Sequence, residues 1–427
     1  MEISPFRGWR YAGRDGDVSD FIAPPYDILS AADKQALLAR SARNIVAVDM
    51  PHVPPKTLGP DAVYRDAAAL LAQWKASGVL VQDSAPAIYA YEQTFHWAGK
   101  SFTRRALICG VRATAFGRDV IPHEQTFAGP KADRLRLTEL TRMQLSPIFG
   151  FYDDPAGSVG KAAFAGTCCP KAFGRLGDVG EKLWVVNDPS VIQAVAKALR
   201  SVPVFIADGH HRYTTALAYR DHLKAAGLID DEHEANFVMF ALVARDDAGL
   251  MILPTHRMIG GLGDDFTIDK LRAAAPEFSW QKADITGASL DNADAFLQPF
   301  GGGAMAFVNQ GATEMWIARL DNPEAMAEAA PDQSDAWRSL DVAILQKLII
   351  EKALVPWRRE GFTVEYSAYG RDVLAACRAG KSQLGVCLQS TPLSAVETIA
   401  RAGQFMPHKS TYFYPKLATG MVLKPLV

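Results

Sequence analysis

The fold is decided by residues 202–223, which read V-P-V-F-I-A-D-G-H-H-R-Y-T-T-A-L-A-Y-R-D-H-L. The first part is apolar and rich in β-branched and aromatic residues, which is typical of a buried strand. From Tyr213 onward the apolar residues recur at helical spacing. Between the two parts, Asp208 is a favourable N-cap residue and Gly209 permits a sharp turn. The stretch therefore predicts a strand, a tight turn and a helix.

The predicted turn has the composition of an anion site. The first N–H groups of a helix have no acceptor within the helix, and the helix dipole attracts negative charge to this end. His210, His211 and Arg212 lie beside those groups, and crowding them together is unfavourable unless something negative binds there. The pattern indicates a phosphate site. The alternative is an ordinary helix cap whose polar neighbours are solvated.

The length and composition are those of a globular protein with two or three domains. Of the 427 residues, 49% are hydrophobic and 22% are charged. The formal net charge of −2 argues against broad nucleic-acid binding, which needs a basic face, but it permits a local basic pocket. We therefore expect no nucleic-acid partner.

Cysteine usage and the N-terminus indicate a cytoplasmic protein. The five cysteines are irregularly spaced, and Cys168 is adjacent to Cys169. They predict neither a disulfide framework nor a zinc motif, so we expect reduced thiols. The N-terminus lacks the apolar centre of a signal peptide, and no window approaches ~18 uninterrupted apolar residues. We expect no membrane span.

Local patterns place the turn at the edge of a sheet. Strands at 183–186 and 202–207, separated by a helix at 189–200, predict a parallel pair with a right-handed crossover. The turn at 208–212 then lies at the carboxyl end of a strand, where open α/β sheets bind ligands.

A stretch of glycines and aspartates at 260–265 (G-G-L-G-D-D) predicts a linker. We expect a core region over residues 1–259 and a C-terminal α+β region over residues 266–427 whose tail can return to the core. Further expected elements are a strand at 44–48, a helix at 61–77, hairpins at 87–111 and 236–254, and a helix at 341–352.

A second polar stretch, residues 121–136, surrounds a predicted turn at Gly129-Pro130. One interpretation is a surface loop that leads into a polar helix face. The functional interpretation uses its glutamate as a general base and one of its cations to hold negative charge. The side chains concerned are those of His123, Glu124 (the base), Thr126, Lys131 and Arg134.

Two more places are candidates for substrate contacts. Asp27 follows two prolines whose fixed φ angles brace its carboxylate, although a proline-rich surface loop is an equal alternative. Residues 406–416 (M-P-H-K-S-T-Y-F-Y-P-K) put cations and hydroxyls beside aromatic rings. They form either an interface strand or a segment that returns to the active site, where the contacts would come from His408, Lys409 and Ser410.

The turn Asp208-Gly209-His210-His211-Arg212 resembles the signature of free serine kinases, which belong to the superfamily of ParB proteins and sulfiredoxin. The chain as a whole is similar to the bacterial and archaeal family catalogued as domain of unknown function 1015. Residues 23–27 (A-P-P-Y-D), 122–126 (P-H-E-Q-T), 206–213 and 407–417 carry this wider resemblance. It implies an α/β class of mixed α+β type, with a ParB/sulfiredoxin-like nucleotide-binding core around a mixed sheet and a C-terminal α+β region.

The resemblance also implies roles within the turn. Its glycine, two histidines and arginine match the phosphate-holding positions and are implied as nucleotide contacts. Asp208 matches the acidic position and is implied as a contact of Mg²⁺ or of the transferred phosphoryl group. These kinases use a glutamate as base, for which we choose Glu124. His210 stands where sulfiredoxin has its nucleophilic cysteine, so sulfinic-acid reduction is not expected, and ParB-like DNA-binding features are not found.

The leading hypothesis is phosphoryl transfer from ATP or ADP, with Mg²⁺, to a small hydroxyl compound such as free L-serine. In this hypothesis Glu124, Asp208 and His211 are catalytic, Asp208 also binds the metal, and the nucleotide contacts are Gly209, His210, Arg212, His123, Thr126, Lys131 and Arg134. One alternative is a metal-dependent hydrolase using His123, His210, His211, His256, His408 and Asp208. Another is a non-catalytic nucleotide-sensing module. The assembly state is open, with a homodimer among the options.

Overall fold

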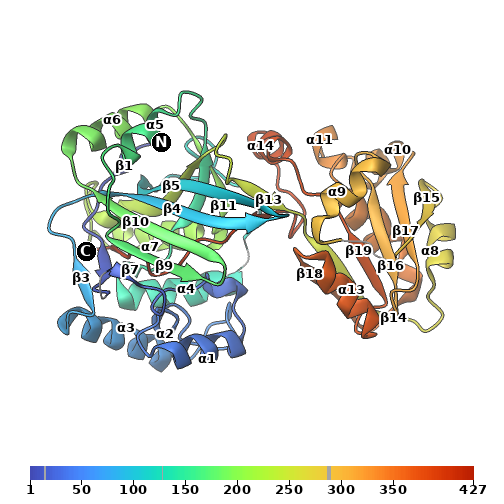
Figure 1. Ribbon diagram of the computed structural model, residues 1–427, viewed down its shortest axis with the longest axis horizontal. Coiled ribbons are helices and arrows are strands. Elements are labelled where there is room, and N and C mark those ends of the chain that lie inside the picture. The colour runs from blue at the N-terminus through green and yellow to red at the C-terminus, as the bar shows by residue number, and fades with distance from the viewer. Residues whose placement is uncertain (14–15, 127, 286–289) are drawn as a thin grey trace. The chain divides into compact units, whose positions relative to one another are not determined.

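The computed structural model describes residues 1–13, 16–126, 128–285 and 290–427. The chain forms two compact units (Figure 1). The first unit contains Met1–Met251 and Pro415–Val427, and the second contains Ile252–Tyr414. The last thirteen residues therefore belong to the same unit as the N-terminus.

A mixed sheet of nine strands forms the centre of the first unit. Its strands run in the order β6-β11-β8-β12-β5-β4-β10-β9, with β1 paired to β5. The β11–β6 and β12–β8 pairs are parallel, and the other pairs are antiparallel. The mixed α+β class is thereby confirmed. The strands are β1 (Ile3–Ser4), β4 (Ile88–Trp97), β5 (Lys100–Arg112), β6 (Val120–Ile121), β8 (Ile148–Tyr152), β9 (Ala172–Leu176), β10 (Val179–Val186), β11 (Val204–Asp208) and β12 (Phe237–Ala244).

Helices cover both faces of this sheet (Figure 1). Helix α5 packs on α6 and touches β4 and β5, while α3 packs on α4 and α4 packs on α7. The helices are α1 (Ala31–Arg40), α2 (Val46–Asp49), α3 (Asp61–Ala76), α4 (Ala128–Thr141), α5 (Ser158–Phe164), α6 (Pro189–Leu199) and α7 (His210–Ala225). Two short strand pairs complete the unit: β2 (Trp9–Tyr11) with β3 (Leu80–Gln82), and β7 (Met143–Gln144) with β21 (Lys424–Pro425).

Three local expectations for the first unit are wrong: the parallel pairing of β10 with β11, the strand at 44–48 and the hairpin at 236–254. Strands β10 and β11 are not neighbours, because β4, β5, β12 and β8 lie between them. Residues 44–48 are not a strand: the buried side chain of Asn44 accepts from the N–H of Val46 at 3.0 Å and starts α2. An apolar run this short does not distinguish the two conformations.

The predicted hairpin at 236–254 does not form either. Strand β12 pairs with β5 on one side and β8 on the other, so both of its edges are occupied. Its expected partner, β13 (Met251–Leu253), pairs instead with β20 (Tyr412–Tyr414).

The second unit is built on a six-stranded sheet in the order β15-β17-β16-β19-β14-β18. The predicted linker at 260–265 begins inside β14, where Gly261 has a φ of 71° and comes so close to Gly361 that a Cβ would lie 2.5 Å from its carbonyl oxygen. The glycines at this point form a β-bulge within strand β14, and they are not part of a linker. The strands are β14 (His256–Leu262), β15 (Phe278–Ala283), β16 (Met305–Asn309), β17 (Met315–Leu320), β18 (Arg358–Ser367) and β19 (Leu384–Cys387).

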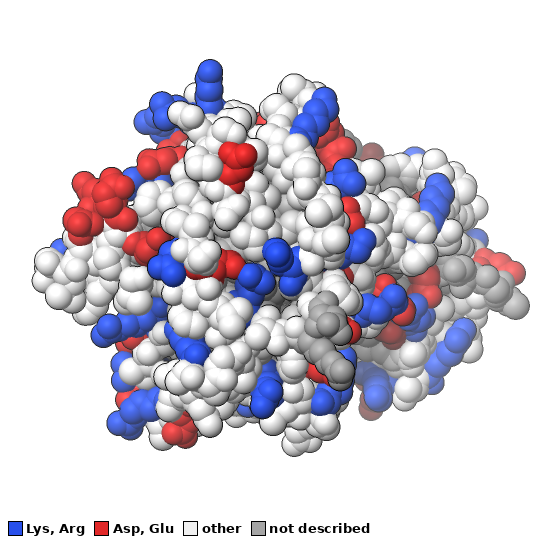
Figure 2. Space-filling model, turned by 60° about the vertical axis from the view of Figure 1, so that its left-hand side comes forward, with Lys and Arg blue, Asp and Glu red and all other residues white. Residues whose placement is uncertain are grey.

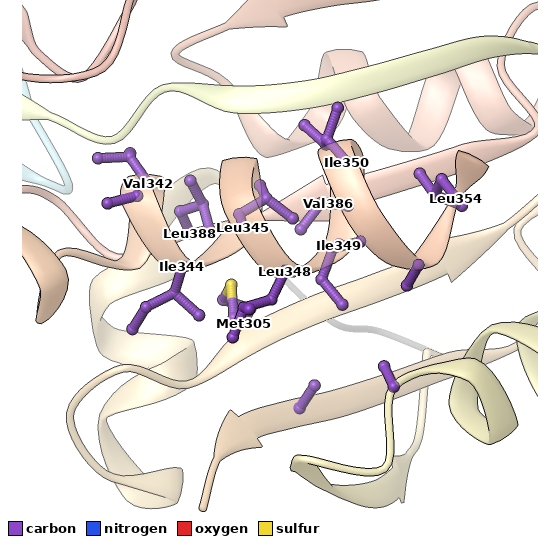
Figure 3. Packing of buried hydrophobic residues seen from close by; sticks show 14 of the residues in the cluster. Met305, Val342, Ile344, Leu345, Leu348, Ile349, Ile350, Leu354, Val386 and Leu388 are labelled. Atoms are coloured by element: carbon purple, nitrogen blue, oxygen red, sulfur yellow. The ribbon is translucent and has the colours of Figure 1, made fainter. Parts of the chain in front are cut away.

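A helical segment packs on this sheet and supplies much of the second unit's core (Figure 3). It begins as α12 (Asp341–Ile344) and continues with π-helical geometry over Leu345–Ala353. In this segment the side chains of Leu345, Leu348 and Ile349 are fully buried. The other helices are α8 (Ile268–Ala274), α9 (Ala293–Leu297), α10 (Glu324–Ala329), α11 (Asp335–Arg338), α13 (Gly370–Arg378) and α14 (Leu393–Arg401).

Lys and Arg side chains are interspersed with Asp and Glu side chains over the face shown in Figure 2, in keeping with the near-zero net charge. Within the described parts of the chain, every helix is too short or too polar to traverse a lipid bilayer.

Strand β8 has no room for a side chain at Gly150, which leads to a prediction about stability. A Cβ at Gly150 would lie 2.5 Å from Cγ2 of Val204 and 3.0 Å from Cδ1 of Phe240. We expect Gly150→Ala to lower the thermal midpoint of unfolding and to destabilise the protein by about 1–3 kcal/mol through overpacking. Gly160→Ala is the control, because the space around Gly160 in α5 is open and alanine favours a helix. A Gly150→Ala midpoint at or above that of the parent would contradict this packing.

Candidate functional site

The central turn of the site follows strand β11. Strand β11 ends at Asp208, Gly209 adopts a left-handed conformation with a φ of 98°, and α7 begins at His210. The expected strand, turn and helix are thus present, but Gly209 is the N-cap in place of Asp208. Because glycine has no side chain, the N-cap residue of this 16-residue helix offers no side-chain acceptor to the first-turn N–H groups.

Two cations meet at the carboxylate of Asp208. Nη2 of Arg212 lies 3.2 Å and Nζ of Lys416 lies 3.5 Å from the same oxygen, Oδ2. The side chain of Arg212 also covers Gly209, where an added Cβ would lie 3.0 Å from Nε. Only glycine fits there without displacing the guanidinium, because the backbone is also left-handed. We call Asp208, Gly209, Arg212 and Lys416 the corner.

Two further contacts, with residues just before β8, hold the guanidinium of Arg212 in place. Nη1 of Arg212 donates to the carbonyl of Pro147 and lies 3.4 Å from Oγ of Ser146, just before β8. The guanidinium is therefore held by the turn and by the neighbouring strand together. The side chains of Arg212, Asp208 and Lys416 remain 11%, 20% and 13% exposed, so a ligand can reach all three.

The two buried histidines near the corner are neutral in ordinary conditions. Burial lowers the pKa of His123 to about 4, and burial, followed by repulsion from His123 when that residue is protonated, lowers the pKa of His210 well below its usual value. Nε2 of His210 accepts from the His123 N–H at 3.2 Å, so its proton is on Nδ1, which lies 3.9 Å from Oε2 of Glu124. The neutral imidazole of His210 supplies no positive charge to a ligand.

A buried network of charges lies behind the corner. Nε of Arg134 donates to Asp133 at 2.8 Å, and its Nη1 donates to Asp49 at 3.3 Å. The hydroxyl of Tyr64 donates to Asp133 at 2.7 Å, and the Arg134 guanidinium lies 3.9 Å from the ring centre of Tyr26. Burial raises the pKa of Asp49 although Arg134 and then Arg212 act in the opposite direction. Arg134 is thus fully occupied by protein groups.

A small cavity adjoins this network. It is lined by Asp49, Arg134, Ser146 and Arg212 together with apolar side chains, and its volume is about 50 Å³. A water molecule occupies about 30 Å³ of liquid, so this space suits solvent and is too small for a nucleotide. A large ligand at the corner would lie on the outer, exposed side of Arg212.

The brace before Asp27 is present, and its carboxylate has an unusual environment. Tyr26 is buried against Arg134, and Asp27 follows it in a short 3-10 helix. Oδ1 of Asp27 is buried and has no hydrogen-bond partner among the described residues. Burial lowers the pKa of Arg212, but the negative charges of Asp208 and then Asp27 act the other way, and the net shift is upward.

The remaining candidates lie between residues 126 and 131 and at the start of α7. Gly129 lies in the first turn of α4, so the expected turn before that helix is displaced, and Phe127 lies outside the described residues. Thr126 and Lys131 are half-exposed, and a ligand role for each stays a prediction, as does the catalytic role of half-buried His211.

His408, Lys409 and Ser410 belong to the second unit. Ser410 is buried and donates its hydroxyl to the carbonyl of Pro407, and the Lys409 carbonyl accepts from Arg257 at 3.1 Å. Their backbone and hydroxyl groups are thus used within the unit, and substrate binding by them stays a prediction.

Sequence reasoning did not select Lys416 or Asp49. Lys416 stood at the end of the basic and aromatic run at 406–416, where a return to the site was the signal. Asp49 followed a segment wrongly interpreted as a strand, and nothing local indicated its burial. Among the described residues, no group of three or more His, Cys, Asp or Glu side chains is arranged to hold a metal ion.

Fold and corner together define a mixed α+β protein with a candidate anion site at the carboxyl end of a strand. The chain belongs to the family described as "Protein of unknown function (DUF1015)", whose model matches residues 3–343, as its motifs predicted. No curated protein matches it significantly.

Several solved structures are similar to this chain at low identity. "Free serine kinase in complex with AMP" is 12% identical with a TM-score of 0.33, covering 73% of this chain and 95% of its own. "SbnI with C-terminal truncation from Staphylococcus aureus" is 11% identical with a TM-score of 0.35, covering 75% and 87%. A conserved hypothetical protein from Pyrococcus furiosus is 12% identical with a TM-score of 0.32, covering 73% and 98%.

The buried histidines predict how stability depends on pH. Unfolded histidines bind a proton near pH 6.5, whereas folded His123 does so only near its pKa of about 4. The unfolded state therefore binds more protons between these values, and stability falls as pH falls, by about 1.4 kcal/mol per pH unit for each such histidine.

We expect His123→Asn to flatten this fall, measured as the unfolding midpoint between pH 7 and pH 5. His222→Asn, at an exposed position on α7, should leave the fall unchanged. Equal slopes in the parent and His123→Asn would show that His123 is not buried in its neutral form.

Proposed function

We propose that the corner binds the phosphates of ATP or ADP and that the first unit transfers a phosphoryl group to a small hydroxyl compound, with free L-serine as the acceptor to test first. The observation that carries the proposal is the convergence of Arg212 and Lys416 on one oxygen of Asp208, at the N-terminal end of α7. Both cations are partly exposed and can contact a ligand.

The backbone and the two cations would divide the work of binding. The N–H groups at the start of α7 would donate to phosphate oxygens, as helix N-termini do in many phosphate sites. Arg212 and Lys416 would neutralise the phosphate charge from two sides. Because Arg212 is already fixed by Pro147 and Asp208, little conformational freedom is lost when a phosphate binds.

The acceptor hydroxyl would attack the terminal phosphorus while the bond from that phosphorus to the bridging oxygen breaks. The hydroxyl proton would pass to a carboxylate, for which Glu124 is the candidate because its Oε2 lies 3.9 Å from Nδ1 of His210, in the first turn of α7. Phosphate would thus move to the acceptor, and the shortened nucleotide would leave with the electron pair of the broken bond.

Mg²⁺ takes carboxylate, phosphate and water oxygens as ligands, so Asp208, and Asp27 with its buried, unpartnered Oδ1, are the residues that would hold it. When bound, such an ion would neutralise charge on the phosphates. The choice of serine rests on the resemblance of the turn at 208–212 to the signature of free serine kinases.

The test is nucleotide binding by calorimetry together with phosphoserine formation from Mg-nucleotide and L-serine. We expect Arg212→Lys and Lys416→Met each to weaken nucleotide binding about tenfold or more, because a charge-assisted contact contributes about 1.5–3 kcal/mol. Both variants should also lose phosphoserine formation.

Lys197→Met is the matched control, since it removes an equal charge from an exposed position on α6. Binding that falls equally in Lys197→Met, or not at all in the corner variants, would sink the proposal. If nucleotide binds but neither serine nor another small alcohol is phosphorylated, the nucleotide site is supported and the proposed kinase activity is refuted. The protein would then be a nucleotide-sensing module.

A further inference from the structure

A row of buried polar side chains crosses the sheet of the first unit. Glu181 on β10 lies directly opposite Gln93 on β4, and Gln93 lies directly opposite Arg104 on β5. Tyr91 is two residues before Gln93 on β4, so it projects from the same face. Each of the four residues is about 1% exposed. We call these four residues the polar row.

The members of the polar row bind one another. Nε2 of Gln93 donates to Oε1 of Glu181 at 3.0 Å, and the Tyr91 hydroxyl donates to Oε2 of the same carboxyl group. Nη2 of Arg104 donates to Oε1 of Gln93. Burial raises the pKa of Glu181 to about 8, although bonds from Tyr91 and Gln93 act the other way. Near neutral pH the buried guanidinium therefore needs further acceptors.

The further acceptors are backbone carbonyls of residues 415–418, the segment in which the chain returns from the second unit. Nη2 of Arg104 donates to the carbonyl of Pro415 at 2.6 Å, and Nε2 of Gln93 donates to that of Lys416 at 3.0 Å. The N–H of Ala418 donates to the Tyr91 hydroxyl at 3.3 Å. The backbone on both sides of the Lys416 side chain is thus bonded to the row, while its ammonium group lies on Asp208.

We propose that the polar row is a positioning device, which holds residues 415–418 so that the ammonium group of Lys416 completes the corner. An apolar row of similar volume would stabilise the sheet as well or better, because buried charges lose their hydration. The row instead directs its donors at the carbonyls of Pro415 and Lys416. The described hydrogen bond from the row to the corner is that of Gln93 to the Lys416 carbonyl, so the row acts through Lys416.

The inference rests on the proposed function only where it concerns nucleotide affinity. The placement of Lys416 can be measured without any nucleotide, through the reactivity of its amine. In the parent protein this side chain is 13% exposed and paired with Asp208, so it should be acetylated slowly. Release of the segment should expose it.

The experiment uses the full chain, labelled with an acetylating reagent and analysed by peptide mass spectrometry. We expect Gln93→Leu to raise the labelling rate of Lys416 at least threefold, and Tyr91→Phe, which removes only one hydroxyl, to raise it less. Two lysines serve as internal references: exposed Lys197 reports reagent activity, and fully buried Lys424 reports general opening of the unit.

Glu92→Gln is the matched control, because Glu92 is the adjacent residue on β4, points to the opposite face and pairs with Arg105 and Lys182. If Lys416 and Lys424 rise together, or if Lys416 does not rise in the variants that fold, the row is only structural and the inference fails. If Gln93→Leu does not fold, the labelling rate of Lys416 in Tyr91→Phe decides whether the row positions Lys416.

Nucleotide affinity gives an independent readout. If Gln93 acts through Lys416, the variant carrying both Gln93→Leu and Lys416→Met should bind nucleotide no more weakly than Lys416→Met alone. Additive losses would contradict a positioning role. If the parent binds no nucleotide at all, the proposed function fails, and the labelling result still decides whether the row places Lys416.

Discussion

Two cations share one carboxylate oxygen at the end of a buried strand, and the candidate site depends on this arrangement. Asp208 alone would place negative charge beside the helix N-terminus, whereas Arg212 and Lys416 bring two positive charges to the same carboxylate. Phosphate binding is favoured when both cations are held in place before a ligand arrives, since long side chains in water lose rotamer freedom on binding. The surrounding structure does this differently for each.

Arg212 is held locally, and Lys416 is held from a distance. The arginine is one turn from Asp208 on α7 and is bonded to the carbonyl of Pro147, so neighbouring elements fix it. The lysine enters only after the chain has passed through the entire second unit. Its backbone bonds to the polar row replace the short-range restraint that sequence proximity gives to Arg212.

The parts of the structure that the sequence predicts are those that depend on neighbouring residues. The strand, turn and helix at 202–223 follow from periodicity and from a glycine that alone tolerates a φ of 98° beneath a guanidinium. The pairing of β12 with β5 and β8 does not, because it is set by which edges are vacant in the assembled sheet. Asp49 and Lys416 were missed for the same reason: each gains its partners from remote segments. Buried His210 illustrates the limit, since its type suggested a cation and its burial keeps it neutral.

The central claim is that a polyphosphate binds in front of Gly209 between Arg212 and Lys416. The most direct measurement is a crystal structure of the full chain grown with a non-hydrolysable ATP analogue. The account predicts phosphate oxygens within hydrogen-bond distance of the first N–H groups of α7 and of both cations. An analogue bound elsewhere on the chain, with the salt bridges of Asp208 unchanged, would contradict it.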